Sequence, residues 1–178
     1  MQYIQDNGRL SQQEAEALYA GIFMDTKGFT SKTGVRTFEA ASYLRRMGVN
    51  PVNVRRLFKT NFASYVTRAD IIRRAEVYRE NIAFSYLYDE CPDMAVTVAQ
   101  AADELLDISG IEASFVLARI GSRVMISGRS LDNINVQVIL EKLGGGGHIT
   151  IAGAQLDDIS VEDADILLKN AIDEVLSE

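Results

Sequence analysis

The residues best suited to chemistry in this chain form one short segment, the four consecutive glycines Gly144 to Gly147 followed by His148. Glycine reaches positive φ at little steric cost, so such a run lets backbone N–H groups turn toward a ligand that approaches the main chain. His148 is the only histidine of the sequence, and it donates two hydrogen bonds when protonated. The segment therefore predicts a loop that binds an anion such as phosphate.

A structural interpretation of the same glycines is also open. Apolar residues recur between Ile134 and Leu143, which predicts a helix, and helices commonly end at a glycine. One cap accounts for one glycine and leaves three without explanation in a chain that has 13 glycines. Because each glycine costs conformational entropy on folding, we favour the ligand loop, with capping as the alternative.

A second polar segment stands just before this predicted helix. Arg129 has the planar fork that holds a phosphate through two parallel hydrogen bonds. Ser130 and Asn133 stand near the expected start of the helix, where free N–H groups favour anions. For Ser130, Asp132 and Asn133, ordinary helix capping is an equally good explanation.

Length and composition predict a globular chain with a core of its own. The sequence has 178 residues, of which 47% are hydrophobic and 24% are charged. Its apolar runs are too short to span a bilayer, and its N-terminus does not resemble a signal peptide, so we expect a soluble chain that is not inserted in a membrane. The single cysteine, Cys91, predicts neither an internal disulfide nor a zinc site and indicates a reducing compartment.

The net charge of −7 argues against binding to long nucleic acids, because their binders use Lys and Arg to displace counterions. The charges are unevenly distributed, with 11 Lys and Arg against three acidic residues between Lys32 and Arg79. This basic region faces phosphates or forms a solvated helix surface, and for most of its residues we favour the surface.

Hydrophobic periodicity predicts helices in the first half of the chain and a mixed pattern in the second. The first expected helix covers 10–24, with Ser11 as cap and Glu14 completing a capping box. The second covers 37–47, with Thr37 as cap and Gly48 as the residue that ends it, and a third helix begins at 50–51. Neither Gly nor Pro occurs from Val52 to Cys91, which predicts a long connecting helix. The expected later strands are 82–88, 114–120, 123–128 and 148–156, with a Gly121-Ser122 turn joining the second and third. The expected later helices are 95–106, around 134–143, and 161–176 with Ser160 as cap. This alternation predicts an α/β domain with a mixed sheet flanked by helices.

Several separated segments resemble one family, the DHH/DHHA1 phosphoesterases, and within it the membrane-anchored cyclic di-AMP phosphodiesterases. The segments are Gly21-Ile22 leading to Asp25-Thr26-Lys27, Thr33 to Leu44, Gly128-Arg129-Ser130, Asn133 to Gln137, and Gly144 to His148. The resemblance implies a hydrolase in which residues 1–61 are the helical C-terminal part of a DHH domain, 62–80 a connecting helix and 81–178 a DHHA1 substrate-recognition domain.

The resemblance also implies the roles of individual residues. The DHH domain of this family binds two manganese ions, and Asp25 matches its last metal-ligand aspartate. The DHHA1 domain recognises the nucleotide, a cyclic dinucleotide or short oligonucleotide. The implied substrate-binding residues here are Arg129, Ser130, Asn133, Gly145, Gly146, Gly147 and His148.

One departure from the family decides what we expect of this chain. The Asp-His-His motif and the upstream His and Asp cluster are absent, because the only histidine lies in the DHHA1 segment. We therefore expect a fragment that begins inside the DHH domain at Met1 and lacks phosphodiesterase activity, since Asp25 alone cannot hold two metal ions. The full-length protein is expected at the cytoplasmic side of the cell membrane, hydrolysing cyclic di-AMP to pApA.

Two alternatives stay open. One is a stand-alone oligoribonuclease or pApA phosphatase of the same family. The other is a non-catalytic nucleotide-binding or dimerisation module, with a homodimer formed through the apolar face of the Phe62 to Ile72 helix. Packing between the two domains is the use of that face that we favour.

Overall fold

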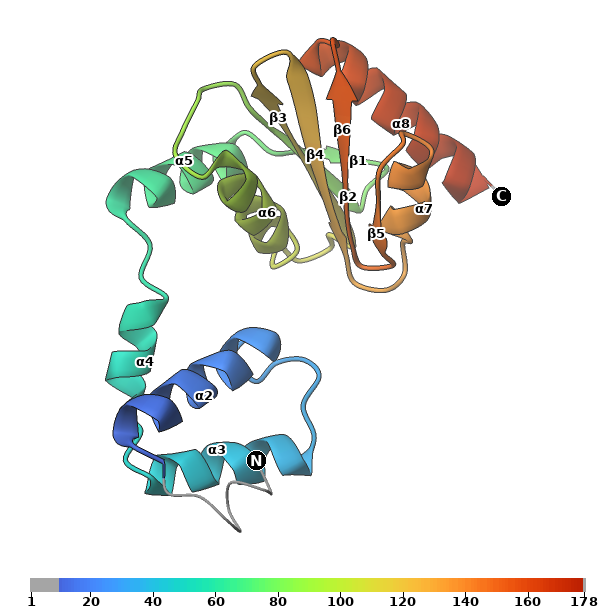
Figure 1. The fold of residues 1–178 in the computed structure, drawn as a ribbon. Coiled ribbons are helices and arrows are strands. Elements are labelled where there is room, and N and C mark those ends of the chain that lie inside the picture. The colour runs from blue at the N-terminus through green and yellow to red at the C-terminus, as the bar shows by residue number, and fades with distance from the viewer. Residues whose placement is uncertain (1–9, 178) are drawn as a thin grey trace. The chain divides into compact units, whose positions relative to one another are not determined.

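The structure, a computed structural model, describes residues 10–177, so Met1 lies outside the described residues. The chain forms two compact units, residues 1–60 and 61–178 (Figure 1). Each unit has its own hydrophobic core. No helix within residues 10–177 is both long enough and apolar enough to cross a bilayer.

The first unit consists of three helices, α2 (Gln12–Asp25), α3 (Val35–Arg46) and α4 (Pro51–Leu57). They enclose a small core of Ala15, Ala20, Leu44, Val49 and Val54. The predicted capping box is confirmed, because the Glu14 backbone N–H donates to Ser11 Oγ and the Ser11 N–H donates to the Glu14 carboxylate. Asn50 caps α4 by accepting a hydrogen bond from the Val52 N–H at 3.0 Å.

The predicted start of the second helix was wrong. Helix α3 begins at Val35 with Gly34 as its N-cap residue, so Thr37 lies inside the first turn. Its Oγ1 accepts a hydrogen bond from the Gly34 N–H at 3.3 Å, which reverses the direction expected of a capping threonine. Gly48, with φ of +97°, ends the helix as predicted.

The second unit is an α/β domain built on a six-stranded mixed sheet, which confirms the predicted fold class. Its elements are α5 (Phe62–Arg73), β1 (Glu76–Tyr78), β2 (Ile82–Leu87), α6 (Met94–Leu105), β3 (Ala113–Ile120), β4 (Arg123–Ser130), α7 (Val136–Glu141), β5 (Gly146–His148), β6 (Ile151–Asp157) and α8 (Val161–Ser177). The strand order is β1-β2-β3-β4-β6-β5, and only β2 and β3 are parallel neighbours.

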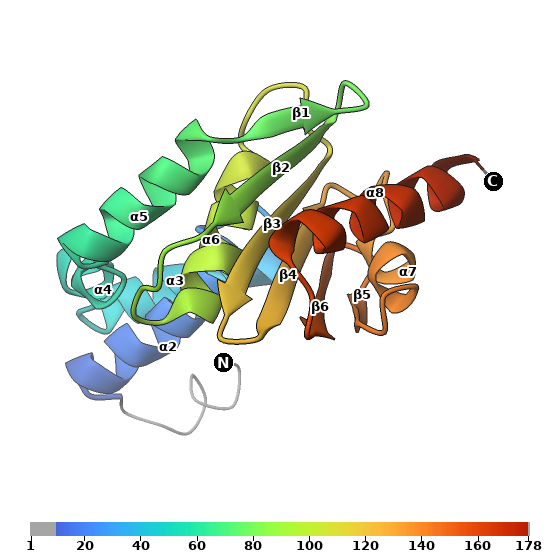
Figure 2. The same ribbon diagram turned by 90° about the horizontal axis from the view of Figure 1, so that it is seen from above.

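Helices cover both faces of this sheet, with α5 and α6 on one face and α7 and α8 on the other (Figure 2). Strand β3 shows how the sequence builds the two layers. Phe115 and Leu117 pack toward α7 and α8, whereas Val116 and Ala118 pack toward α5 and α6. Because both faces are buried, the strand reads as a continuous apolar run.

The long connecting helix predicted through residue 80 was wrong in its second half. Helix α5 ends at Arg73, and β1 then forms a hairpin with β2. The turn of this hairpin is made by Arg79 and Glu80, which adopt φ of +49° and +70° although neither is glycine. Without glycine or proline the turn leaves no signal in the sequence.

Helix α5 is fixed to α6 through one buried arginine. Arg68 Nε lies 2.8 Å from Glu104 Oε1, and its Nη1 donates to Gln100 Oε1 at 2.9 Å. Ile71 joins the core beneath α6. The helix therefore belongs structurally to the second unit. Arg68 is the buried exception in a basic region whose other arginines and lysines are exposed, as predicted.

Two later elements also differ from the prediction. The single strand expected over 148–156 is the hairpin of β5 and β6, which turns at Ile149 and Thr150. Helix α7 begins only at Val136, and its cap is Asn135, whose side chain accepts from the backbone N–H of Gln137 and Val138. Ser130, Asp132 and Asn133 therefore do not cap this helix.

Candidate functional site

A groove of about 460 Å³ opens on the α6 face of the sheet in the second unit. Its floor consists of residues from β4 and β6. The lining residues are Ala95, Met125, Ile126, Ser127, Arg129, Gly145, Ala152, Gly153, Ala154 and Gln155. A concave site of this size, with an apolar lining and a few convergent polar groups, is typical of small-ligand binding.

The strand register orders the groove floor from end to end. Met125, Ser127 and Arg129 alternate along β4 on the face toward α6, as the period of two requires. In β6, Gln155 pairs with Met125 and Gly153 pairs with Ser127. At the usual rise of a strand, Met125 and Arg129 are about 13 Å apart. Because Gln155 pairs with Met125, its amide and the Arg129 guanidinium lie toward opposite ends of the groove.

Helix α6 forms a wall along the floor. It connects the parallel strands β2 and β3 and so runs antiparallel to both, whereas β4 is antiparallel to β3. Helix α6 and strand β4 therefore run in the same direction. Asp103 on α6 lies beside Arg129, and Ala95, about 12 Å earlier on the helix, lines the groove with Met125.

Arg129 is the one positively charged residue among the described residues that line the groove, and it is only 9% exposed. Its Nη1 donates to Ser127 Oγ at 3.0 Å and to the Gly128 carbonyl at 2.9 Å. Its Nε lies 3.3 Å from Asp103 Oδ2, close enough for an ion pair but without the alignment of a hydrogen bond. Among the described residues, this buried Nε has no hydrogen-bond partner.

Gly144 is explained by the end of helix α7. Its φ is +75°, its N–H donates to the Glu141 carbonyl at 3.0 Å, and the Gly145 N–H donates to the Leu140 carbonyl at 2.8 Å. These two bonds around a left-handed residue are the Schellman ending of a helix. The capping interpretation is therefore confirmed for Gly144.

Gly145 and Gly147 are required by close packing of β5 on β6. A Cβ at Gly145 would lie 2.3 Å from the Gly153 carbonyl oxygen, and a Cβ at Gly147 would lie 2.3 Å from the Ile151 carbonyl oxygen. Gly146 differs, because a Cβ there would meet nothing within 4 Å. The structure thus accounts for three of the four glycines without a ligand and leaves Gly146 open.

The predicted site residues fall into separate places. Arg129 and Gly145 line the groove, whereas Gly146, Gly147 and His148 form the short edge strand β5, with His148 exposed. Ser130 lies on the opposite face of β4 from Arg129, where its Oγ donates to the Ile149 carbonyl at 3.3 Å. Asn133 lies in an exposed bend after β4. Their roles in substrate binding stay predictions.

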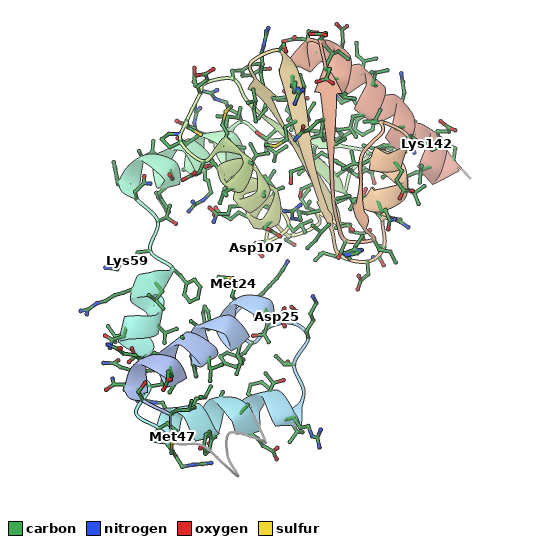
Figure 3. All side chains as sticks on the ribbon, viewed as in Figure 1. Met24, Asp25, Met47, Lys59, Asp107 and Lys142 are labelled. Atoms are coloured by element: carbon green, nitrogen blue, oxygen red, sulfur yellow. The ribbon has the colours of Figure 1, made fainter. Side chains whose placement is uncertain are left out.

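Asp25 lies in the first unit, as the last residue of α2 (Figure 3), and is exposed. Within residues 10–177, no group of three or more His, Cys, Asp or Glu side chains could hold a metal ion. The donor set of the described residues therefore does not fit a manganese centre, and the metal role of Asp25 stays a prediction.

Sequence reasoning missed eight residues of the groove: Ala95, Met125, Ile126, Ser127, Ala152, Gly153, Ala154 and Gln155. They belong to three elements and to residue types that occur throughout protein cores and surfaces. One signal was visible in the sequence. Met125 and Ser127 alternate in the strand predicted over 123–128, and continuing this alternation by one residue beyond the strand puts both on the face of Arg129.

Comparison with known proteins decides the family. Residues 81–178 match the model of the DHHA1 domain. The chain belongs to the DHHA1 domain family. Every described residue that lines the groove lies inside this DHHA1 domain.

Longer relatives of this DHHA1 domain have named activities. The chain is 48% identical over 173 residues to the cyclic-di-AMP phosphodiesterase GdpP of Geobacillus thermodenitrificans, covering 97% of the chain and 26% of that protein. It is 42% identical over 173 residues to the cyclic-di-AMP phosphodiesterase PdeA of Listeria monocytogenes, again covering 97% of the chain and 26% of the relative. The chain thus spans about a quarter of the length of these relatives.

A solved structure shares the fold. The crystal structure of an exopolyphosphatase-related protein from Bacteroides fragilis matches with a TM-score of 0.83 at 21% sequence identity. The match covers 94% of this chain and 53% of the other. At this identity the likeness supports the α/β architecture alone.

Proposed function

We propose that this chain is the nucleotide-recognition half of a phosphodiesterase that hydrolyses cyclic di-AMP to pApA. The observation that carries the proposal is Arg129, which is buried at the groove floor with an Nε that makes no hydrogen bond among the described residues. Buried polar groups normally have partners, so an unsatisfied guanidinium nitrogen at a groove supports an anionic ligand such as a phosphate. The named activities of the longer relatives supply the substrate class.

The groove also has apolar and neutral polar residues that suit a nucleotide. Apolar lining from Ala95 and Met125 suits the flat face of a base, and Ser127 adds a hydroxyl. Because Gly153 has no side chain, it leaves space for a ligand over the middle of the groove floor. The edge strand β5, which contains Gly146 and His148, is proposed to border the ligand next to β6. Because Gly146 has no Cβ, a ligand can approach the main chain there.

The chemistry of hydrolysis is proposed to lie in the rest of a longer, membrane-anchored protein with its enzymatic part on the cytoplasmic side. That longer protein would hold two manganese ions, which supply the Lewis-acid chemistry of phosphodiester hydrolysis when bound. Asp25 would supply one carboxylate ligand, which is too few to hold both ions. The chain alone is therefore proposed to bind the nucleotide without cleaving it.

Calorimetric titration of cyclic di-AMP and pApA into the chain tests the recognition role, with His148→Ala and Arg129→Gln as variants. We expect binding by the parent chain and weaker binding by both variants, at unchanged folding. A failure of both nucleotides to bind would contradict an autonomous recognition module.

A separate assay tests the absence of turnover. The purified chain is incubated with cyclic di-AMP and Mn²⁺, and formation of pApA is followed by chromatography. No product is expected. Turnover that disappears in Asp25→Ala would contradict the proposal, because the loss would exclude a contaminating enzyme.

A dimerisation role is the second candidate, and one observation favours it. Helix α5 exposes Phe62 and Tyr65, at 82% and 60% of their surface, one turn apart near its N-terminal end. Apolar residues clustered on one helix face are typical of an interaction surface. Sedimentation over a range of concentrations tests it; a persistent monomer would remove the homodimer.

A further inference from the structure

The groove has a second end, far from Arg129, whose chemistry is different. Met125 on β4 and Gln155 on β6 face each other there in the antiparallel register, and Ala95 on α6 borders them. Within residues 10–177, no charged residue lines this end. Gln155 is exposed, and its amide has no hydrogen bond to any other described residue.

This pair of side chains suits a flat aromatic ring with polar atoms on its rim. A thioether is polarisable and makes favourable contacts with aromatic rings, and the small Ala95 side chain leaves room beside it. An amide group presents one acceptor oxygen and two donor hydrogens. Met125 therefore offers a surface for the face of a ring, while Gln155 offers hydrogen bonds to its edge.

The spacing along the floor connects this end to the anion-binding end. Met125 and Arg129 are four residues apart on one strand, about 13 Å, with Gly153 between them on the neighbouring strand. A ligand that spans the floor therefore has an anion at one end and a ring at the other, separated by a part that lies over a glycine. A nucleotide has this order of groups.

We propose that Gln155 is the specificity-determining residue of the groove and hydrogen-bonds the edge of the purine base, while Met125 packs on its face. The inference rests on the proposed function, because it assumes that the ligand is a nucleotide. It adds a residue that selects the base. The amide accepts from the adenine N6 amino group and donates to an adjacent ring nitrogen, the two-bond pairing that glutamine makes with adenine.

A carboxylate at the same position has the opposite preference. Glutamate at neutral pH has no donor, so it would face the unprotonated ring nitrogen of adenine with an acceptor. The Watson–Crick edge of guanine carries N–H donors on N1 and N2, and a carboxylate can accept both. Gln155→Glu should therefore shift the preference of the groove from adenine toward guanine without changing the shape of the side chain.

The test measures dissociation constants of pApA and its guanine counterpart pGpG for the whole chain and three variants. Gln155→Glu changes the base-reading group, and Gln155→Ala removes it. Asn170→Asp is the matched control, because it turns an exposed amide into a carboxylate with the same change in net charge on α8, which covers the other face of the sheet. Circular dichroism and thermal unfolding confirm that each variant is folded.

The expected result is a change in the ratio of the two constants. Gln155→Glu should weaken pApA binding by about tenfold and move the pGpG to pApA ratio toward guanine, since a two-bond base contact contributes roughly 1–3 kcal/mol of discrimination. Gln155→Ala should weaken pApA binding without favouring pGpG, and Asn170→Asp should leave the ratio unchanged.

Two results would overturn the inference, and they are distinguishable. If the parent chain binds pApA but the ratio is the same in Gln155→Glu, Gln155 does not read the base, whereas the proposed nucleotide groove stands. If the parent chain binds neither dinucleotide, the proposed function fails and the role of Gln155 fails with it.

Discussion

Arg129 Nε lies 3.3 Å from Asp103 Oδ2 at one end of the groove, while Nη1 of the same guanidinium is held by Ser127 and by the Gly128 carbonyl. The strand thus fixes the orientation of the arginine through two hydrogen bonds. Asp103 contributes mainly its negative charge, because its carboxylate is not aligned for a hydrogen bond with Nε. The Asp103 carboxylate thus places a negative charge beside the arginine that we propose as the phosphate-binding residue.

Asp103→Asn should therefore lower the stability of the fold while it raises the affinity for the nucleotide. The buried guanidinium loses its counter-charge, so the free energy of unfolding should fall by about 1–2 kcal/mol, less than for a fully buried pair because Asp103 is partly exposed. Binding of pApA should become tighter, by roughly fivefold, because one negative charge near its phosphate is removed. Denaturant titration and calorimetry measure the two effects.

The control for this prediction is Asp107→Asn. Asp107 is exposed in the turn that follows α6 (Figure 3), so the substitution changes the net charge equally without touching the Arg129 pair. It should alter neither stability nor affinity appreciably. Weaker pApA binding in Asp103→Asn would mean that the carboxylate orients the arginine for its ligand, contrary to the charge argument.

The glycine segment should respond unequally to alanine. Gly145→Ala should lower the free energy of unfolding by roughly 1–3 kcal/mol, because its Cβ would overlap the Gly153 carbonyl oxygen and the Ala154 side chain. Gly146→Ala should leave stability unchanged or slightly raised, since its Cβ meets nothing within 4 Å. Denaturant titration distinguishes them.

The same Gly146→Ala variant tests the ligand-loop prediction. If a nucleotide approaches the main chain at this residue, the added methyl group should weaken pApA binding although the fold is intact. Unchanged affinity would leave no role for Gly146 in binding. Stability is expected to change in Gly145→Ala and affinity in Gly146→Ala, so the two effects are measured in different variants.

Gly153→Ala should obstruct the groove while the protein still folds. A Cβ there would lie 3.4 Å from the Ile126 carbonyl oxygen, an ordinary contact, and Gly153 lines the groove floor. We expect an unchanged unfolding transition and pApA affinity that is roughly tenfold lower, the scale of one misplaced methyl group in a packed site. Equal affinity in a folded variant would show that the ligand does not lie over this part of β6.

A last prediction concerns the attachment of α8 to the sheet. Burial, together with a hydrogen bond to Asp165 at 2.9 Å, raises the pKa of Tyr86 above its usual value of 10.0. The neutral phenol is thus favoured in the folded chain, so its contribution to stability is present below about pH 10 and is lost as the pH rises further.

Tyr86→Phe removes this contribution. At neutral pH the variant should be less stable by about 1–2 kcal/mol, because a hydrogen bond to a charged group is lost while Lys169 remains paired with Asp165. Above about pH 10 the difference between parent and variant should shrink. Parallel denaturant titrations at several pH values measure it; a constant difference would contradict the assigned pKa shift.

Much of the fold was predictable where local signals agree with the tertiary structure. The capping box of Ser11 and Glu14 and the hairpin of β3 and β4 around Gly121 were predicted from short sequence patterns. The failures are turns without a signal. Arg79 and Glu80 adopt positive φ, and Ile149 and Thr150 reverse the chain between β5 and β6, although none of these residues is typical of a tight turn.

The site was predictable only in part, for a related reason. Arg129 and Gly145 stood out by type or by repetition, and both line the groove. Met125 and Gln155 are common residues 30 positions apart, and only the register of β4 and β6 makes them neighbours. Pairing across a sheet depends on tertiary structure, so no local pattern announces it.

The most direct test of the central claim is to map pApA onto the ¹⁵N-labelled chain by NMR chemical-shift perturbation. We predict saturable shifts at the backbone amides of Ser127, Gly145, Gly153 and Gln155, with those of α8 unaffected. Shifts confined to other parts of the chain, or no shifts at all, would contradict the assignment of the groove as the nucleotide site.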